Sequence, residues 1–206
     1  MMKYTFGYIR HNEDVFNQYL EKSLSELEGD YLIISTDDTE MPAKNYNHML
    51  SMCQTKYLIL THQDISFSKN LLLNIDRTIE EIPNDFGGLC LVGVDSVGNY
   101  YWSEEKISHQ VSISDACFIL INTENKIKFN EDIFNEFHLY VEDYCAQMGF
   151  EKKSLYTILT SSNVNFKESS YILHHGHTVS QRGFFWGNYN KYKKIFNDKW
   201  PNTYTT

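Results

Sequence analysis

Three groups of titratable side chains have the composition of a small-molecule site. The groups are His62 with Asp64, the adjacent pair Glu142 and Asp143, and the cluster of His174, His175 and His177. Carboxylate oxygens suit hard divalent cations, and an imidazole suits manganese better than calcium. One carboxylate with one or two histidines could therefore hold Mn²⁺ or Mg²⁺ beside a diphosphate. A carboxylate near a hydroxyl can also take its proton as that oxygen attacks.

The histidine cluster admits more than one interpretation. Three histidines within four residues also suit zinc, although no His-Glu-x-x-His motif or cysteine partner accompanies them. A neutral histidine in the core or in a loop is the simpler alternative for each one. Among the three, we predict that His177 contacts a metal ion or a phosphate.

Glu142 and Asp143 cannot both face one site if they lie on a helix. Adjacent helical side chains point about 100° apart. We therefore expect one carboxylate to serve the site and the other to bind a structural partner. An exposed pair of helical charges is the simpler alternative.

The group around Asp64 lies where an α/β sheet binds its ligands. Tyr57 to Ile65 begins as an apolar run without helical spacing, which predicts a buried parallel strand covered on both faces. Open α/β sheets bind ligands just beyond the carboxyl ends of their strands. His62 and Asp64 follow that end directly. The alternative is that Asp64 caps a helix that starts near Ser68.

The first forty residues predict a β-α-β unit with acids at its tip. We expect a strand over Tyr4–Ile9, a helix that continues through Glu28, and a second strand over Tyr31–Ser35. Asp37 and Asp38 follow the second strand, where a carboxylate often accepts hydrogen bonds from a ribose or a base. Solvated loop acids are an equally good alternative.

The remaining segments alternate between helix and strand, which indicates a mostly parallel sheet with right-handed crossovers. Asp95–Gln110 is aromatic and charged, and predicts a hairpin or a loop over the site. The expected helices are Pro42–Cys53, Ser68–Ile82, Asp132–Met148 and a last helix that contains Phe185, Tyr189, Tyr192 and Phe196. The expected strands are Phe86–Val94, Asp115–Ile121, Leu155–Leu159 and Tyr171–Leu173.

Composition limits the class of protein. A chain of 206 residues with 42% hydrophobic content supports one core, and a net charge of −9 argues against a nucleic-acid partner. The four scattered cysteines read as reduced core residues, and we expect a soluble, cytoplasmic protein without a signal peptide or transmembrane segment. The lysine- and aromatic-bearing last helix could touch the inner face of the membrane, but packing on the core is the simpler account.

The order of these motifs resembles the GT-A glycosyltransferases, specifically the small bacterial family-2-like group linked to capsule and surface-polysaccharide synthesis. The resemblance spans roughly residues 30 to 180. His62-Gln63-Asp64 stands where that group has its His-Gln-Asp version of the Asp-x-Asp motif. The other matching segments are Ala43–Asn47, Asp115–Ala116, the His-x-Tyr-x-x-Asp segment in His138–Cys145, and His174–His177.

The resemblance implies a fold and an activity. The fold would be an α/β, Rossmann-like three-layer sandwich with a mostly parallel central sheet, as a single domain over 1–206. Residues 1–94 would form the nucleotide-binding half, 95–182 the acceptor and catalytic half, and 183–206 the C-terminal helix. The protein would move a sugar from a nucleotide-diphosphate donor to a hydroxyl of a carbohydrate or lipid-linked glycan, with inversion.

The resemblance also assigns roles to residues. Asp143 would be the general base, and Asp64 with His177 would hold a divalent cation, Mn²⁺ or Mg²⁺. The donor would contact Asp37, Asp38, Tyr46, Asn47, His62 and Asp64. The sugar and the acceptor would contact Asp115, Trp102, His138 and Glu142. A histidine replaces the first carboxylate of Asp-x-Asp, so metal dependence does not follow from the motif.

Two other functions stay open. One is a catalytically silent GT-A-like domain that binds a sugar or a partner protein. The other is a metal-dependent hydrolase or nucleotidyltransferase that uses the cluster His174–His177. The sequence leaves the oligomeric state, the sugar, the nucleotide and the acceptor open.

Overall fold

The computed structural model describes residues 2–37, 41–103, 107–136, 138–159, 172–174 and 186–205, and of 172–174 and 186–188 it describes the main chain. The strands of its main sheet are β1 (Tyr4–Ile9), β2 (Tyr31–Thr36), β3 (Tyr57–Thr61), β5 (Gly88–Cys90), β8 (Gln110–Val111), β10 (Phe118–Asn122) and β11 (Leu155–Thr157). Their spatial order is β2-β1-β3-β10-β5-β11-β8. Strands β2, β1, β3, β5 and β11 run in one direction, and β10 and β8 run in the other. The expectation of a mostly parallel central sheet is confirmed.

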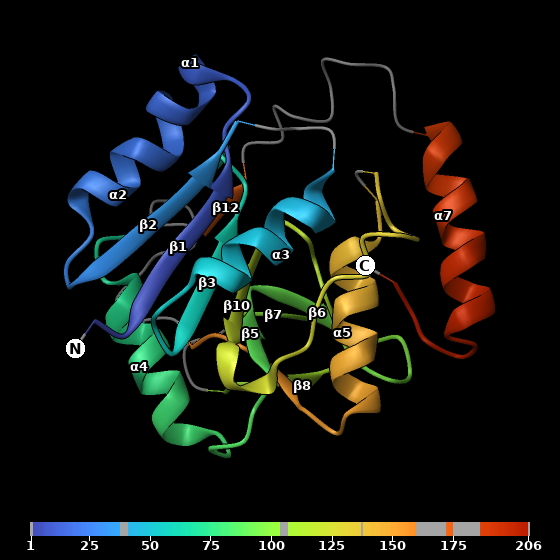
Figure 1. Cartoon of the computed structure of the whole chain (residues 1–206). Helices are drawn as coiled ribbons and strands as arrows, with labels where there is room; N and C mark the ends of the chain where they lie inside the picture. The colour runs from blue at the N-terminus through green and yellow to red at the C-terminus, as the bar shows by residue number, and fades with distance from the viewer. Residues whose placement is uncertain are drawn as a thin grey trace.

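Helices cover both faces of this sheet (Figure 1). The helical segments are α1 (Glu13–Phe16), a π-helical turn (Asn17–Glu21), α2 (Lys22–Glu26), α3 (Pro42–Met52), α4 (Leu71–Glu81), a 3₁₀ turn (Thr123–Asn125), α5 (Tyr140–Phe150) and α7 (Trp186–Lys199). The segment from α1 to α2 packs on one face together with α4, and α3, α5 and α7 pack on the other. The three-layer sandwich is therefore confirmed.

The strand β3 shows why both faces must be covered. Its side chains alternate between the two layers: Tyr57 and Ile59 join the core under α4, and Leu58 and Leu60 join the core under α3 and α5. All of them are at most 2% exposed. A strand that is apolar at every position loses its hydrophobic stabilisation unless both faces are dry.

Two small sheets extend from the sandwich. One pairs β4 (Ile65–Phe67) with β12 (Ile172–His174), and the other has the order β7 (Tyr100–Trp102), β6 (Val92–Val94), β9 (Ile113–Ser114). The expected single strand over Phe86–Val94 is wrong, because the chain bends at Leu91 and passes from β5 in the main sheet to β6 in the small one. The expected hairpin after Asp95 is confirmed.

The boundaries of several elements differ from their predictions. The helix expected over Asp132–Met148 begins at Tyr140, because Leu139 adopts a left-handed conformation (φ 59°) that a continuous α-helix cannot contain. That helix ends at Phe150, past Gly149. The helix expected from Ser68 begins at Leu71, and the strand expected from Asp115 begins at Phe118.

The last helix packs on the core, which was the simpler of the two predictions made for it. Tyr192 and Phe196 are fully buried, and Tyr189 packs against the same cluster. Phe185 lies outside the described residues. Within those residues, none of the helices has a stretch long and apolar enough to cross a bilayer.

Candidate functional site

The turn His62–Asp64 follows β3 at the centre of the main sheet. Thr61, the last residue of β3, pairs with Tyr8 of β1 on one side and with Phe118 of β10 on the other. Because β1 is parallel to β3 and β10 is antiparallel to it, the residues after β1 and the residues before β10 lie at this same edge. The main chain closes the turn, since the His62 N–H donates to the Cys117 carbonyl at 3.0 Å. Asp64 is fully buried.

Asp115 stands in the tight turn between β9 and β10. Its Oδ1 accepts from the Cys117 N–H at 2.7 Å, and its own N–H donates to the Val92 carbonyl at 3.1 Å. This local bond is an Asx turn, which an aspartate forms without the help of distant residues. The side chain is half-buried, so a ligand can reach a carboxylate whose position the turn fixes.

Asp115 and Asp64 come together at the Cys117 thiol. Burial raises the pKa of the Cys117 thiol well above its ordinary value, and the charges of Asp115 and Asp64 raise it further. Both carboxylates therefore act on one buried sulfur atom. The structure brings together two predicted site residues that are 51 positions apart in the sequence.

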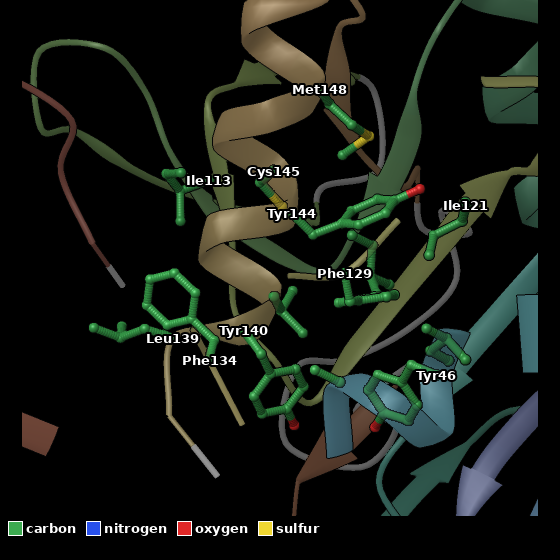
Figure 2. Close-up of a cluster of buried hydrophobic side chains, with 14 of the residues drawn as sticks. Tyr46, Ile113, Ile121, Phe129, Phe134, Leu139, Tyr140, Tyr144, Cys145 and Met148 are labelled. Carbon is green, nitrogen blue, oxygen red and sulfur yellow. The ribbon is translucent and has the colours of Figure 1, made fainter. Parts of the chain in front are cut away.

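The first turn of α5 adds Glu142 to this group. Burial raises the pKa of the Tyr140 phenol, and so do the neighbouring Tyr46, Glu142 and Asp115. Tyr140 also forms a side-chain hydrogen bond with Tyr46 of α3. Figure 2 shows these two rings with their oxygens at the same end of the cluster, with ring centroids 5.6 Å apart. Glu142 and Asp115 thus act on the same phenol.

Asp143 faces the other way, toward the C-terminal helix. Its Oδ1 accepts from Lys199 Nζ and from Trp200 Nε1, each at 2.7 Å, and its Oδ2 accepts from Gln147 Nε2 at 2.9 Å. The carboxylate is fully buried. The sequence predicted that one member of the pair would bind a structural partner, and these contacts give that place to Asp143, which the resemblance had made the general base.

The predicted nucleotide residues lie in two different environments. Asp37 follows β2, is largely exposed, and accepts from Arg10 Nε at 3.2 Å. Asn47 uses its amide to hold the segment before α5: its Nδ2 donates to the Phe129 carbonyl, and its Oδ1 accepts from the Phe129 N–H. Tyr46 is 2% exposed. Asp38 lies outside the described residues. The donor contacts of Tyr46 and Asn47 stay predictions.

Trp102 and His138 lie on the side of the second half of the chain. Trp102 is 62% exposed on β7, in the small sheet whose strand β9 leads directly into Asp115. His138 precedes α5, and its ring meets Tyr189 of α7 edge to face at 5.6 Å. The exposed indole offers an apolar face to a ligand, whereas the His138 ring contributes to the packing of α7.

The histidine cluster begins beside Asp64. The strand β12 pairs antiparallel with β4, and His174 is the register partner of Ile65, the residue that follows Asp64. His175 and His177 lie outside the described residues. The strand pairing therefore brings the main chain of His174 next to the Asp64 turn.

Asp64 fits a hard divalent cation in its chemistry, since a carboxylate oxygen is a preferred ligand of Mg²⁺ and Mn²⁺. Within the described ranges, however, no group of three or more His, Cys, Asp or Glu side chains could hold a metal ion. Of the two predicted metal ligands, Asp64 is the one that lies in the described residues.

Sequence reasoning missed Gln63 and Cys117. Gln63 is 2% exposed although it is polar and lies in a turn, and its place between His62 and Asp64 was the only available signal. Cys117 was assigned to the core, which is correct, but its electrostatic interaction with two carboxylates depends on the pairing of β3 with β10. The bonds of Asp143 to Lys199 and Trp200 join segments 56 and 57 residues apart, and no local pattern indicates them.

Comparison with known proteins gives a likeness at the level of structure. A scan against protein-family models gives no match, and neither does a search of curated protein sequences. Among solved structures, residues 1–349 of TarS from S. aureus are similar over 79% of this chain and 59% of that one, with a TM-score of 0.53 and 15% identity. The same TarS fragment has also been solved with UDP.

Two further solved structures are similar to the same extent. The mannosyltransferase PcManGT from Pyrobaculum calidifontis, in complex with GDP-Man and Mn²⁺, has a TM-score of 0.55 and 9% identity, over 77% of this chain and 56% of that one. GalNAc-T7 with UDP, GalNAc and Mn²⁺ has a TM-score of 0.55 and 6% identity, over 77% of this chain and 42% of that one. This chain thus matches about half the length of these enzymes. Identities this low establish the fold alone: the chain has the GT-A glycosyltransferase fold.

Proposed function

We propose that the protein is a glycosyltransferase that moves a sugar from a nucleotide-diphosphate donor to an acceptor hydroxyl, with inversion. The observation that carries the proposal is the acid group of Asp64, Asp115 and Glu142 at the carboxyl end of β3. In an open α/β sheet this edge is where ligands bind. Asp64 and Asp115 both raise the pKa of the Cys117 thiol, and Asp115 and Glu142 both raise the pKa of the Tyr140 phenol, which supports a common location.

The charge of this group bears on the cofactor. A diphosphate is strongly negative, and three carboxylates at the same edge repel it unless a cation lies between them. Asp64 would hold a divalent cation, Mn²⁺ or Mg²⁺, together with the diphosphate oxygens and His177. Such an ion supplies positive charge where the departing phosphate gains negative charge. Asp115 would border the sugar, and Asp37 the ribose or base.

Glu142 is the better candidate for the general base. The base needs to be ionised and placed near the acceptor hydroxyl, and an ordinary carboxylate is already ionised at neutral pH. Asp143 receives three hydrogen bonds from side chains that fill its surroundings, one of them a lysine. Both oxygens of this carboxylate are thus already engaged by fixed donors. Glu142 instead shares its surroundings with Asp115.

The acceptor would approach from the small sheet. Trp102 presents an exposed indole on β7, and aromatic faces pack against the apolar faces of sugar rings. A carbohydrate or a lipid-linked glycan would fit this surface, and surface-polysaccharide synthesis is the role that the resemblance suggests. His138 would influence acceptor binding indirectly, because its ring packs against Tyr189 of the last helix.

Donor binding is the first test. Thermal unfolding of the wild type and of Asp64→Asn is measured with UDP-, GDP-, CMP- and dTDP-sugars, with and without Mn²⁺. A ligand that binds only the folded state raises the melting temperature. We expect one nucleotide class to raise it in the presence of Mn²⁺, and the effect to disappear in Asp64→Asn. A wild type that responds to none of these donors would refute the proposal.

Transfer is the second test, with the donor that binds. We expect Glu142→Gln to lower kcat by about 10²- to 10⁴-fold, the usual contribution of a general base, while donor binding persists. Asp143→Asn is the matched neighbour, and its activity per folded molecule should be largely kept. A large loss of kcat in Asp143→Asn, with activity kept in Glu142→Gln, would identify Asp143 as the general base. Donor binding without transfer to any acceptor in the wild type would favour the silent binding domain.

A further inference from the structure

Two aromatic side chains of β7 project to one face of the small sheet and lie largely in solvent. Tyr100 is 58% exposed and Trp102 is 62% exposed. Alternate residues of a strand share a face, and along an antiparallel strand they are about 7 Å apart. Exposed aromatic surface is unfavourable in water, so neighbouring exposed rings mark a binding surface more often than single ones do.

The residue between these two holds β7 in place from the other face. Tyr101 stacks on the His109 ring with centroids 4.5 Å apart, and its hydroxyl donates to Asp95 Oδ2 at 3.1 Å. Tyr101 also packs against the core under α5. Because Tyr101 fixes which face of β7 is turned toward the core, Tyr100 and Trp102 are directed toward solvent.

The chain around Thr205 braces the same hairpin. The Tyr100 hydroxyl donates to the Thr205 carbonyl at 3.4 Å, and Lys193 of α7 donates to the Thr205 hydroxyl at 3.1 Å. At the tip of the hairpin Gly98 has φ +92°, and a Cβ on it would lie 3.0 Å from the Tyr204 ring. The two segments therefore fit closely. A surface that is already braced binds a ligand without the entropy cost of ordering it.

The register of the small sheet relates the two rings to the acid group. Trp102 pairs with Val92 of β6, and from the other side of β6 the Asp115 N–H donates to the Val92 carbonyl at 3.1 Å. Trp102 and Asp115 thus lie in one row across the sheet, two strand spacings or about 10 Å apart. Tyr100 pairs with Val94, two residues farther along β6. The rings therefore form a line that starts in the row of Asp115 and leads away from it.

We propose that Trp102 and Tyr100 form a platform for successive sugar rings of the acceptor, which makes the acceptor an oligosaccharide or a longer glycan and not a single sugar. The proposal rests on the proposed function for the role of this glycan as the acceptor. The end of the glycan that receives the new sugar would lie near Asp115. The ring behind it would lie on Trp102, and the next ring on Tyr100.

The chemistry of the two side chains fits a glycan. A pyranose has a C–H face that matches a single aromatic ring in size, so two aromatic rings about 7 Å apart bind two sugar rings and not one. Phenol and indole each combine an apolar face with a hydrogen-bonding group at the edge, and a sugar combines C–H faces with hydroxyls in the same way. Neither side chain is charged, so the platform suits neutral sugar rings.

The dependence of glycan binding on length is the first test. Binding to an array of immobilised oligosaccharides of one to six rings, taken from bacterial surface polysaccharides, is measured for the wild type, Trp102→Ala, Tyr100→Ala and the double variant. We expect wild-type binding to rise with each ring up to three. For three-ring glycans, Trp102→Ala should weaken binding about tenfold and Tyr100→Ala about threefold. The double variant should bind short and long glycans equally.

Phe150→Ala is the matched control, because Phe150 is an aromatic residue of α5 that is 76% exposed and has Trp200 as its ring neighbour. It should bind every glycan as the wild type does. Equal weakening by Phe150→Ala would overturn the proposal, and so would wild-type binding that does not rise with length. Sedimentation tests the other occupant of this surface. A wild-type dimer that dissociates in Trp102→Ala would mean that a second copy covers the rings, which also overturns the proposal.

Transfer assays separate this proposal from the function on which it rests. With the donor that binds, Trp102→Ala should raise the KM for a three-ring acceptor about tenfold, as expected when an interaction of the ground state and the transition state is lost equally. Transfer by the wild type without preference for longer acceptors would overturn the platform and leave the transferase in place. Length-dependent glycan binding by a wild type that binds no nucleotide sugar would refute the transferase and the acceptor role, and would uphold the platform as a sugar-binding surface.

Discussion

The turn after β3 and the first turn of α5 have the same arrangement of two adjacent residues, but the interactions that these residues make are different. In each, one residue joins the acid group and its neighbour in sequence binds a distant segment. In the turn after β3 the pair is Asp64 with Gln63, and the anchor is a neutral amide with neutral partners. In α5 the pair is Glu142 with Asp143, and the anchor is a buried charge paired with Lys199.

The difference predicts how much folding stability is lost when the contacts of Gln63 or of Asp143 are removed. A neutral amide that loses its partners leaves unpaired polar groups, whereas a buried ion pair that loses one partner leaves an uncompensated charge. The α5 anchor should therefore matter more for stability. The turn after β3 should matter more for ligand geometry, because it carries Asp64.

Asp143→Asn should have the largest effect on stability. The change keeps the shape of the side chain but removes the negative charge opposite Lys199, and we expect a loss of about 3 kcal/mol in the free energy of unfolding. Urea denaturation measures it. The double variant Asp143→Asn with Lys199→Met removes both charges and should recover part of the loss. If the double variant were less stable than the sum of both changes, the ion pair would not be the cause.

Gln63→Met should have an intermediate effect. It leaves the N–H groups of His11 and Asn12 without their acceptor, and we expect a loss of about 2 kcal/mol by the same measurement. Gln147→Met is the matched change on α5, where only donors are removed, and Asp143 keeps its bonds from Lys199 and Trp200. It should cost about 1 kcal/mol. A larger loss in Gln147→Met than in Gln63→Met would contradict the account of the two anchors.

Asp95 offers the smallest effect, because it is an anchor of the same kind on the surface. Partial burial opposes its ionisation, but hydrogen bonds from Asn99, Val97 and Tyr101 outweigh this and lower the pKa of Asp95 from 3.8 to about 2. A lowered pKa means that the stabilisation is complete above the ordinary value and is lost as the pH falls from 3.8 toward 2.

The measurement is the pH dependence of the Val97 and Asn99 amide resonances. Both N–H groups donate to Asp95 Oδ1 at 2.9 Å, so their signals should shift together within that pH window and stay constant above it. Asp95→Asn should abolish this transition while the rest of the spectrum is kept. A transition centred at the ordinary carboxyl pKa would show that the turn does not hold the charge.

The fold was predictable from the sequence where local pattern and tertiary position agree. The strand Tyr4–Ile9 and the helix that starts at Pro42 were predicted at their observed starts, since an apolar run and an N-terminal proline are local signals. The start of α5 was not predictable, because helical spacing extends across Leu139, whereas the structure gives Leu139 a positive φ at which the helix begins.

The candidate site was predictable in its members more than in its arrangement. His62, Asp64, Asp115 and Glu142 stand out as polar residues at the ends of apolar elements. The bonds of Asp143 to Lys199 and Trp200, which support Glu142 as the residue that faces the site, are not indicated by any spacing within α5. The hydrogen bonds from the His11 and Asn12 N–H groups to Gln63 likewise depend on β1 and β3 being neighbours in the sheet.

The long separation between Asp143 and its partners has a consequence for biosynthesis. A nascent chain emerges from the ribosome in order, so β1, β2 and β3 can pair while the residues after α5 are still being made. Asp143 must then wait for Lys199 and Trp200 before its charge can be buried. Until those residues leave the ribosome, the layer of α3 and α5 lacks its last helix, and the apolar surface that this helix covers in the folded protein is exposed.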